Sequence, residues 1–372
     1  MRFDIPETMH AVLLTGHGGP EKLEYRSDVK VPRPNRGEVL IRVGATAVNN
    51  TDINTRIGWY SKQVKSATQA GNSTGFDQVD NEDASWSGIA LQFPLIQGAD
   101  CCGRVVAVGE DVDPSRIGQR VLVRNMLRTP VDGRPFECWT YGSDINGAFA
   151  QYTVAPDADI WAINSELSDV ELASFPCSYS TAEVLVQRAS VKGSDTVLIT
   201  GASGGVGSAA VQLVKCRGAR VIAIASNTKR EEILSLGADQ VVDRGADLIE
   251  SLGKNSVSVV LDLVGGPDWP SLLQVLRTGG RYAVAGAIAG PLVELDLRTL
   301  YLKDLTFFGC TWQDDQVFDS LVEHIEASRI RPLVSKVYPL SEIVQAQADF
   351  VEKRHTGKLV LVPPQEYGHE NR

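Results

Sequence analysis

The sequence predicts a two-domain α/β protein in which a small β-barrel accompanies an open parallel sheet with helices on both faces. Short β-type runs, broken by glycine and proline, fill the chain up to about residue 165, and this pattern is typical of a barrel. Beyond that point apolar runs alternate with helical patterns, as repeated strand–helix–strand units do. The chain has 372 residues, which is too long for one ordinary hydrophobic core, so two domains are expected.

The barrel prediction rests on short strands bounded by turn residues. They are expected at residues 39–43, 103–108, 120–123 and 149–154. Two long stretches in this part show no clear period. Residues 61–93 are rich in Gln, Asn, Ser, Asp and Gly, and such a loop is typically either a functional lid or disordered, which the residues leave open. Residues 125–146 are interpreted as an ordinary surface loop.

Six apolar runs form the expected parallel sheet, and helical patterns connect them. The strands are expected at residues 196–200, 220–225, 240–243, 257–262, 282–285 and 305–309. Helices are expected at residues 181–189, 207–217, 229–236 and 315–328, and a last strand at residues 358–362. The alternation predicts βαβ units, whose parallel strands are covered by helices on both faces.

Composition and charge exclude several classes of protein. A formal net charge of −10 argues against nucleic acid or an anionic membrane as the main partner, because both need a basic surface. No stretch has the ~20 apolar residues of a membrane span, and residues 1–7 lack the apolar segment of a secretion signal. The six cysteines contain no Cys-x-x-Cys pair and are expected to be reduced. A cytoplasmic protein is therefore expected.

A glycine-rich turn lies between the first buried strand of the sheet and the helix that follows it. Missing side chains allow a pyrophosphate to approach the backbone, and the N-terminus of the helix offers free N–H groups and partial positive charge. Strand, turn, helix and second strand together predict a Rossmann-type dinucleotide site. The alternative is a tight turn without a ligand. The expected contacts are Gly201, Ser203, Gly204, Gly205, Val206 and Gly207.

The end of the second strand bears on which nicotinamide dinucleotide binds. An acid there would favour NAD, because it would hydrogen-bond the ribose 2′-hydroxyl. The chain instead has Ser226 and Asn227, followed by Lys229 and Arg230, and two cations suit the 2′-phosphate of NADPH. The alternative is that both cations begin a solvated helix. Further cofactor contacts are expected at the carboxyl ends of the later strands, namely Leu263, Val264, Gly286, Ala287, Phe308, Gly309 and Thr311.

Several stretches resemble a known family in both order and spacing. They are residues 37–43, 49–60, 98–109, 201–207, 236–239 and 356–358. Together they resemble the medium-chain dehydrogenase/reductase superfamily, and most of all its zinc-free quinone oxidoreductase branch. The resemblance implies a GroES-like barrel (residues 1–164 and 313–372, with 61–93 as an insertion) beside a Rossmann domain (residues 165–312). It also implies an active site in the cleft between them, and a homodimer or homotetramer paired near residues 305–311.

The resemblance also bears on metal content. Zinc-dependent relatives bind catalytic zinc at positions that match Asn49, Ala99, Asp100 and Cys177, and only the last two are potential ligands. About three donor side chains are needed, so no catalytic metal is expected. An atypical metal at Asp100 and Cys177 stays open. The structural zinc of those relatives needs four cysteines where this chain has only Cys138, so that metal is not expected either.

Without a metal Lewis acid, hydride transfer favours a substrate that spreads the developing charge over its own π-system. The resemblance therefore implies reduction of quinones or enones by NADPH. Thr51 and Asn49 are the candidate catalytic residues, and their alternatives are a helix cap and a buried structural amide. The candidate substrate contacts are Asn54, Trp59 and Tyr60. For the two aromatic residues, the alternative is ordinary packing in the core. Thr181 and Lys358 are further candidates for contacts with the cofactor.

Two other functions remain open from the sequence. One is a zinc-type alcohol or aldehyde dehydrogenase with an atypical metal site. The other is an NADPH-binding module without catalytic activity, for which residues 61–93 would serve as a cover or a partner surface.

Overall fold

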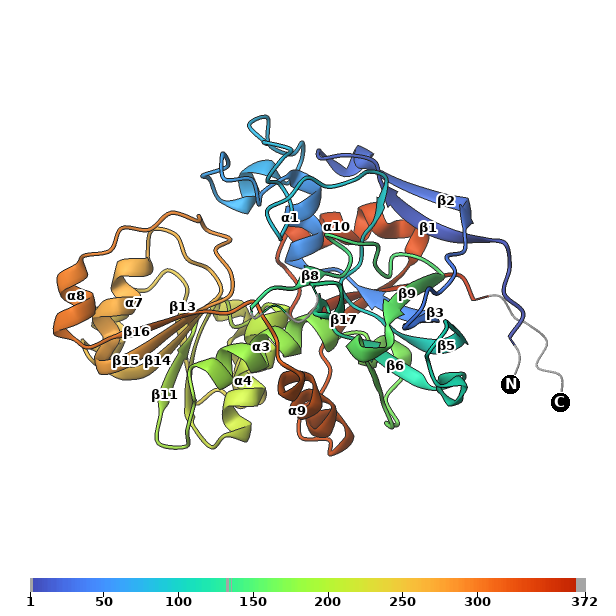
Figure 1. The fold of residues 1–372 in the computed structure, drawn as a ribbon. Coiled ribbons are helices and arrows are strands. Elements are labelled where there is room, and N and C mark those ends of the chain that lie inside the picture. Colours follow the sequence, from blue (N-terminus) through green and yellow to red (C-terminus); the bar gives the residue numbers. More distant parts are fainter. Residues whose placement is uncertain (1–2, 132–133, 135, 366–372) are drawn as a thin grey trace.

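The computed structural model describes residues 3–131, 134 and 136–365, which form two sheet systems beside each other. Figure 1 shows the parallel sheet on the left and the barrel on the right, with helices α3 (Pro176–Arg188) and α4 (Gly205–Cys216) beside the sheet and α3 running toward the barrel. The predicted fold class, a GroES-like barrel with a Rossmann sheet, is confirmed. Within the described residues, no helix combines the length and apolarity that crossing a bilayer requires.

The barrel contains a seven-stranded sheet and a three-stranded sheet. The larger has the order β10 (Ile160–Ala162), β6 (Arg120–Val123), β5 (Cys102–Val108), β3 (Glu38–Ala47), β18 (Lys358–Val362) and β17 (Val334–Pro339), while β9 (Tyr152–Pro156) also pairs with β3. The smaller has the order β2 (Leu23–Lys30), β1 (Thr8–Leu14) and β4 (Leu95–Ile96). Because β18 pairs with β3, it brings Lys358 from the end of the chain to the first half of the barrel.

The second sheet has six parallel strands, as predicted. Its order is β13 (Gln240–Asp243), β12 (Arg220–Ala225), β11 (Thr196–Ile199), β14 (Val257–Asp262), β15 (Leu276–Val284) and β16 (Thr306–Gly309). The strand order reverses direction between β11 and β14. In open parallel sheets, ligands bind outside the carboxyl ends of the strands at such a reversal.

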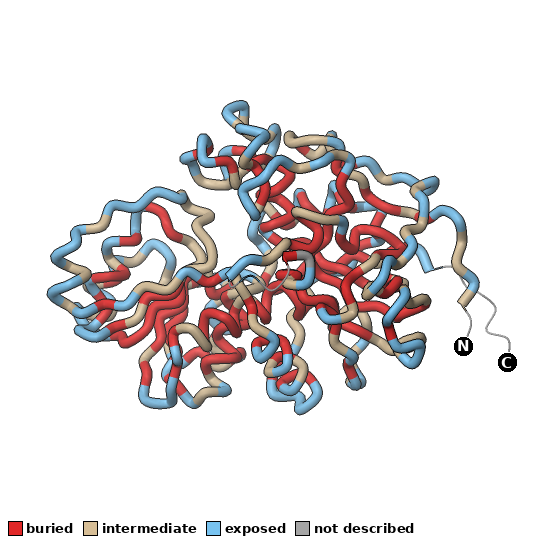
Figure 2. The backbone as a smooth tube through the Cα atoms, viewed as in Figure 1, coloured by how far each residue is buried: buried red, intermediate tan, exposed pale blue. Residues whose placement is uncertain are grey.

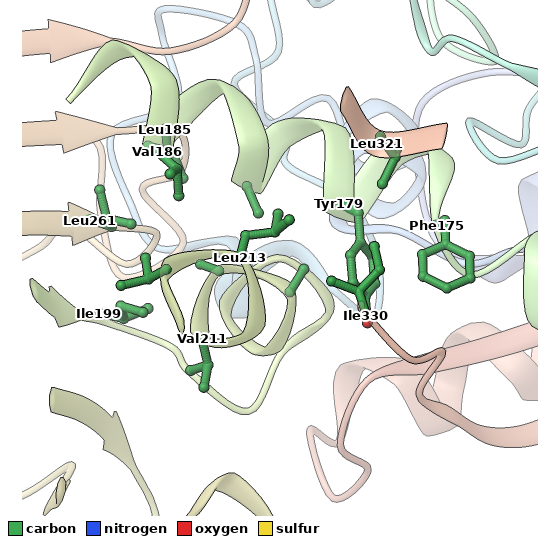
Figure 3. Close-up of a cluster of buried hydrophobic side chains, with 14 of the residues drawn as sticks. Phe175, Tyr179, Leu185, Val186, Ile199, Val211, Leu213, Leu261, Leu321 and Ile330 are labelled. Atoms are coloured by element: carbon green, nitrogen blue, oxygen red, sulfur yellow. The ribbon is translucent and has the colours of Figure 1, made fainter. Parts of the chain in front are cut away.

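The helices bury apolar faces against this sheet and against one another. Figure 3 shows Leu185 and Val186 of α3 close to Leu213 of α4, with Ile199 and Leu261 of the sheet beside them. The remaining helices are α1 (Asn50–Ile57), α2 (Asp169–Leu172), α5 (Arg230–Ser235), α6 (Leu248–Leu252), α7 (Trp269–Val275), α8 (Leu297–Leu302), α9 (Asp315–Glu326) and α10 (Ile343–Val351). Short 3₁₀ helices include η2 (Thr68–Gly71) and η6 (Asn227–Lys229).

Two expectations need correction. Helix α3 begins at Pro176, five residues before the expected start, because proline is well suited to the first turn of a helix. Cys177 therefore lies within that turn and not ahead of the helix. Residues 125–146 are also more than a surface loop: β7 (Met126–Leu127) pairs with β8 (Trp139–Thr140), and Asn125 and Tyr141 are buried.

Buried residues run along both sheets, and exposed residues concentrate in the connections (Figure 2). The insertion at residues 61–93 contains only the short helix η2, yet it is tied to its surroundings. The Arg56 guanidinium at its base donates to the carbonyl oxygens of Gly18 and Asn72 and to Gln347 Oε1. The other side of the insertion reaches the half of the molecule that contains the parallel sheet, where Thr68 donates its backbone N–H to Ile288 O at 3.1 Å.

Candidate active site

The glycine-rich turn has the geometry of a phosphate site. Gly201 has a φ of +59°, a region that disfavours residues with a side chain. A Cβ on Gly207 would lie 2.2 Å from Gly201 O, so only glycine allows the turn to close onto α4. Helix α4 begins after Gly204, and no side chain caps its first N–H groups. Those N–H groups and the positive end of the helix are therefore available to an anion.

The barrel lies against the other side of this turn. Gly357 donates its backbone N–H to Ser203 O at 3.1 Å, which joins the turn to the segment ahead of β18. A Cβ on Gly205 would lie 2.6 Å from Ser178 Oγ and 3.0 Å from the Lys358 side chain. The predicted turn and Lys358 are thus neighbours, although residues 207 and 358 are far apart in the sequence.

The residues at the end of β12 meet a second group of polar side chains. Ser226 Oγ lies 2.8 Å from Thr228 Oγ1. The Lys229 ammonium donates to the carbonyl oxygens of Lys353 and His355. Arg230 instead donates to Val241 O at 2.9 Å, on the neighbouring strand β13. Lys229 thus contacts the segment ahead of β18, whereas Ser226 contacts Thr228 and one arm of Arg230 is engaged with β13.

That segment adds a cation, Lys353, that sequence reasoning missed. The Lys353 ammonium lies 4.0 Å from the Phe350 ring centre and 2.9 Å from Asn50 Oδ1, so it is desolvated although part of its chain is exposed. This desolvation and the charge of Lys229 lower the pKa of Lys353 to about 8. Burial, then Lys353 and Lys229, lower the pKa of His355 to about 4. The consecutive Lys, Arg and His at positions 353–355 are the sequence feature that could have indicated this group.

A buried lysine, Lys358, occupies the centre of the region formed by Asn49, Asp100 and Cys177. The Lys358 ammonium forms an ion pair with Asp100 Oδ2 at 2.7 Å, and both side chains are almost fully buried. It also donates to Asn49 Oδ1 and, at 3.3 Å, to Ser178 Oγ. Asn49 Nδ2 donates to Asp100 Oδ2 at 2.8 Å, and the Cys177 backbone N–H donates to Asp100 Oδ1 at 2.7 Å.

These residues do not fit a catalytic zinc ion. Asp100 Oδ2 already accepts hydrogen bonds from an ammonium and an amide, and that ammonium would repel a divalent cation at the same place. Burial raises the pKa of the Cys177 thiol well above its usual range, which opposes the thiolate that a metal requires. Among the described residues, no group of three or more His, Cys, Asp or Glu side chains could hold a metal ion.

Helix α1 brings the candidate catalytic and substrate residues together. Asn49 is its N-cap, and the Asn49 backbone N–H donates to Asp52 Oδ2 at 2.7 Å in a capping box. Burial raises the pKa of the Asp52 carboxyl to about 7. Thr51 therefore lies inside the helix and does not cap it. The Tyr60 hydroxyl donates to Thr51 Oγ1 at 3.2 Å and also interacts with the Asn54 side chain.

A cavity of about 590 Å³ opens at the carboxyl ends of β15 and β16. This volume lies within the ~300–1,000 Å³ of typical small-molecule sites. Trp59, a predicted substrate contact, lines it, whereas Tyr60 packs edge-on against Trp59 and Trp86. The wall formed by the sheet contains Val284, Ala285, Gly286, Ala287, Gly309, Cys310 and Thr311, which include four of the predicted cofactor contacts.

The predicted cofactor contacts Thr181, Leu263, Val264 and Phe308 do not line this cavity. The Thr181 hydroxyl donates to Cys177 O at 2.7 Å, so its proton is used within α3. The backbone N–H groups of Leu263 and Val264 donate to Thr200 Oγ1 and Asp262 Oδ1. The Phe308 side chain packs against the hydrophobic core beside α3 and α4 and does not line the described cavity.

Comparison with known proteins identifies the family. Residues 35–165 match the alcohol dehydrogenase GroES-like domain, and residues 205–327 match the zinc-binding dehydrogenase family. A solved structure from Sinorhizobium meliloti 1021, provisionally described as an alcohol dehydrogenase, is 45% identical with a TM-score of 0.85, and the alignment covers 97% of this chain and 98% of that one. The chain belongs to the medium-chain dehydrogenase/reductase superfamily.

Within this superfamily the chain is quinone oxidoreductase-like. It is 28% identical to a quinone oxidoreductase of Lama guanicoe, over 95% of this chain and 97% of that one. It is 27% identical to an acryloyl-coenzyme A reductase of Metallosphaera sedula, over 95% and 99% of the two chains. As a medium-chain dehydrogenase/reductase it is an oxidoreductase, and its cofactor is a nicotinamide dinucleotide.

Proposed function

We propose that this medium-chain dehydrogenase/reductase is a zinc-independent, NADPH-dependent enzyme that reduces quinones or activated alkenes (enones). The observation that carries the proposal is the network of Lys358, Asp100 and Asn49, which stands where related enzymes bind zinc. Without a Lewis acid, the substrate itself must delocalise the negative charge that hydride addition creates. Conjugated quinones and enones do so. The names of relatives, quinone oxidoreductase and acryloyl-coenzyme A reductase, support the same substrate classes.

The choice of NADPH is supported by the cations near the end of β12. The ammonium groups of Lys229 and Lys353 gather there, and that strand ends in Ser226, where NAD-binding chains have an acid. A 2′-phosphate is a dianion near neutral pH and would be stabilised by these groups. When bound, the cofactor supplies a hydride from C4 of its nicotinamide ring.

The proposed roles of the protein residues follow from the contacts of α1. Thr51 Oγ1 accepts a hydrogen bond from Tyr60, so its own proton is free to be donated to the reduced substrate. Burial raises the pKa of Tyr60, which keeps its hydroxyl protonated and therefore a donor to Thr51. Asn49 is fixed by Lys358 and Asp100 and holds the N-terminus of α1, which contains Thr51. A hydroxyl pair of this kind passes on the one proton that must accompany each hydride, and solvent water restores it before the next turnover.

The test is a screen of NADPH oxidation with quinones, neutral enones and aldehydes, each run with and without a metal chelator. We expect turnover of quinones or enones that the chelator leaves unchanged. Thr51→Val is expected to lower kcat by about 10- to 100-fold, in line with the loss of a positioned proton donor, whereas Thr74→Val in the exposed insertion leaves kcat unchanged. One zinc per chain together with chelator-sensitive aldehyde reduction would contradict the proposal.

We also propose that the protein forms a homodimer or homotetramer through the edge of the parallel sheet. Strand β16 is the edge strand there, and α8 and the residues ahead of it lie near it in the chain. Large apolar side chains are exposed in this region, namely Leu292, Val293, Leu297, Tyr301 and Leu302. Clustered exposed apolar residues are typical of a protein–protein interface.

A further inference from the structure

The cavity at the ends of β15 and β16 has a charge opposite to that of the whole protein. Its described lining contains two cations, Lys62 and Arg188, and no carboxylate, although the chain has a formal net charge of −10. A cleft lined by charge of one sign concentrates ligands of the opposite sign. The lining therefore indicates the charge of the molecule that enters.

Neither cation forms an ion pair within 4.0 Å of a carboxylate among the described residues. Lys62 is an exposed residue of the insertion, and its backbone N–H donates to Asp83 Oδ2 at 2.9 Å. This hydrogen bond, then the Ser61 hydroxyl and the Lys62 charge, lower the pKa of the Asp83 carboxyl. Arg188 lies in the last turn of α3 and donates to Gly309 O at 3.1 Å and to Trp312 O at 3.3 Å. A guanidinium has five N–H donors, so others remain for a ligand.

The same cavity has flat aromatic walls. Phe136 and Trp312 lie with ring centres 5.3 Å apart, and the Arg188 guanidinium lies over Phe136 at 5.5 Å. Trp59 lines the cavity from the barrel half. Aromatic faces of this kind pack well against planar conjugated molecules. Charge and shape therefore favour one class of ligand, a planar anion.

We propose that the substrate is a planar conjugated carbonyl compound that carries an anionic group, a carboxylate or a phosphate, and that Lys62 and Arg188 bind this group. The inference rests on the proposed function, because it names the substrate class of the same site. The aromatic walls hold the conjugated part of the substrate beside the nicotinamide, whose proposed contacts Gly286 and Gly309 form the sheet-side wall. The two cations, contributed by the insertion and by α3, bind the charged end.

A matched set of ligands tests this inference by binding, so that the result does not depend on turnover. The set is benzylideneacetone with a para-carboxylate, its neutral methyl ester, and the para-phosphate analogue. Because Trp59 and Trp312 line the cavity, tryptophan fluorescence with NADP⁺ present reports each dissociation constant. We expect the carboxylate or the phosphate to bind about tenfold tighter than the ester at low salt, with the advantage shrinking as salt screens the charges. The tighter of the two identifies the anion.

Variants separate charge from structure. Lys62→Gln is expected to reduce the preference for the acid over the ester by about fivefold, while Lys65→Gln, an exposed lysine of the insertion that does not line the cavity, leaves it unchanged. Because Arg188 also holds two backbone carbonyls, Arg188→Lys is the second variant, and it is expected to keep most of the preference.

Equal affinity for acid and ester in the parent protein, or equal losses for both ligands in Lys62→Gln, would overturn the inference. The proposed function fails separately, if NADPH reduces neither the acid nor the ester nor any quinone. A preference for the anion in binding would then still stand.

Discussion

Lys358 is the residue on which the polar network of the site depends. It lies on β18, the last strand of the described chain, and its ammonium contacts the buried side chains of Asp100, Asn49 and Ser178. A buried carboxylate needs a paired cation, because the cost of desolvating an unpaired charge is several kcal/mol. The pair therefore makes the first and last parts of the barrel interdependent.

Replacing Lys358 by methionine keeps the volume of the side chain and removes its charge. We expect Lys358→Met to lower the free energy of unfolding by about 3–5 kcal/mol, because Asp100 is left buried without a cation. Urea denaturation measures this loss. The double variant Lys358→Met with Asp100→Asn should recover part of it, and a single variant as stable as the parent protein would contradict the expectation.

Lys353 gives the proposed NADPH site a pH dependence. Its pKa of about 8 in the free protein lies below the usual lysine value, chiefly because of desolvation and then because of Lys229. A 2′-phosphate favours the charged form, so affinity is highest below pH 8 and falls as the free lysine loses its proton. We expect the Kd for NADPH to rise about tenfold between pH ~7.5 and pH ~9.5, with little change for NADH.

Isothermal titration at several pH values measures both constants. Lys353→Gln should weaken NADPH binding at pH ~7.5 and remove most of this pH dependence, while leaving NADH unaffected. His355, with its pKa lowered to about 4, stays neutral over this range and does not contribute. Parallel changes for NADPH and NADH would show that Lys353 does not contact the phosphate.

At the scale of elements, the insertion at residues 61–93 connects the two halves of the molecule across the cleft. It is anchored to the barrel through Arg56, and η2 contacts the loop after β15 through Thr68 and Ile288. That loop also contains Gly286 and Ala287, which line the cavity. The insertion is therefore positioned to control how far the cleft opens.

A proline at position 68 tests this connection cleanly. Thr68 is the first residue of η2, where proline is tolerated, and Ala67 ahead of it already has the extended conformation that a following proline requires. Thr68→Pro removes only the N–H and hydroxyl donors to Ile288 O. We expect hydrogen exchange in the insertion to increase several-fold, with Tm lowered by no more than about 2 °C.

The control is Thr68→Ser, which keeps both donors and should exchange as slowly as the parent protein. Unchanged exchange in Thr68→Pro would show that the contact at Ile288 does not restrain the insertion.

At the scale of the whole molecule, five of the nine large apolar residues that are exposed in the described part of the chain lie at positions 292–302. Leu297, Tyr301 and Leu302 of α8 are each more than half exposed, beside the unpaired edge of β16. We expect the parent protein to be a dimer or tetramer by light scattering, and Leu297→Asp with Leu302→Asp to yield smaller species, because buried unpaired charges oppose association. Val344→Asp, on α10, is the control. A monomeric parent protein would contradict this proposal.

The sequence by itself determined the parallel sheet and the phosphate turn. Strands β12, β13 and β14 have the predicted bounds, because buried parallel strands form continuous apolar runs that local sequence reveals, and the barrel strand β18 also has its predicted bounds. The turn at residues 201–207 could also be predicted from the sequence, because only glycine tolerates the close approach of Gly201 and Gly207. The resemblance indicated Thr51, Asn54 and Tyr60 as site candidates, and the structure shows that their side chains meet.

Only the tertiary structure decided what surrounds those residues. Lys358 meets Asp100 and Asn49 because β18 pairs with β3, a contact between residues about 300 positions apart that no local pattern encodes. The same holds for Lys353 beside Lys229, for Thr68 on Ile288, and for Lys62 and Arg188 in one cavity. Local sequence predicts the elements through backbone sterics and side-chain period, whereas charge partners and cavity walls depend on how distant elements pack.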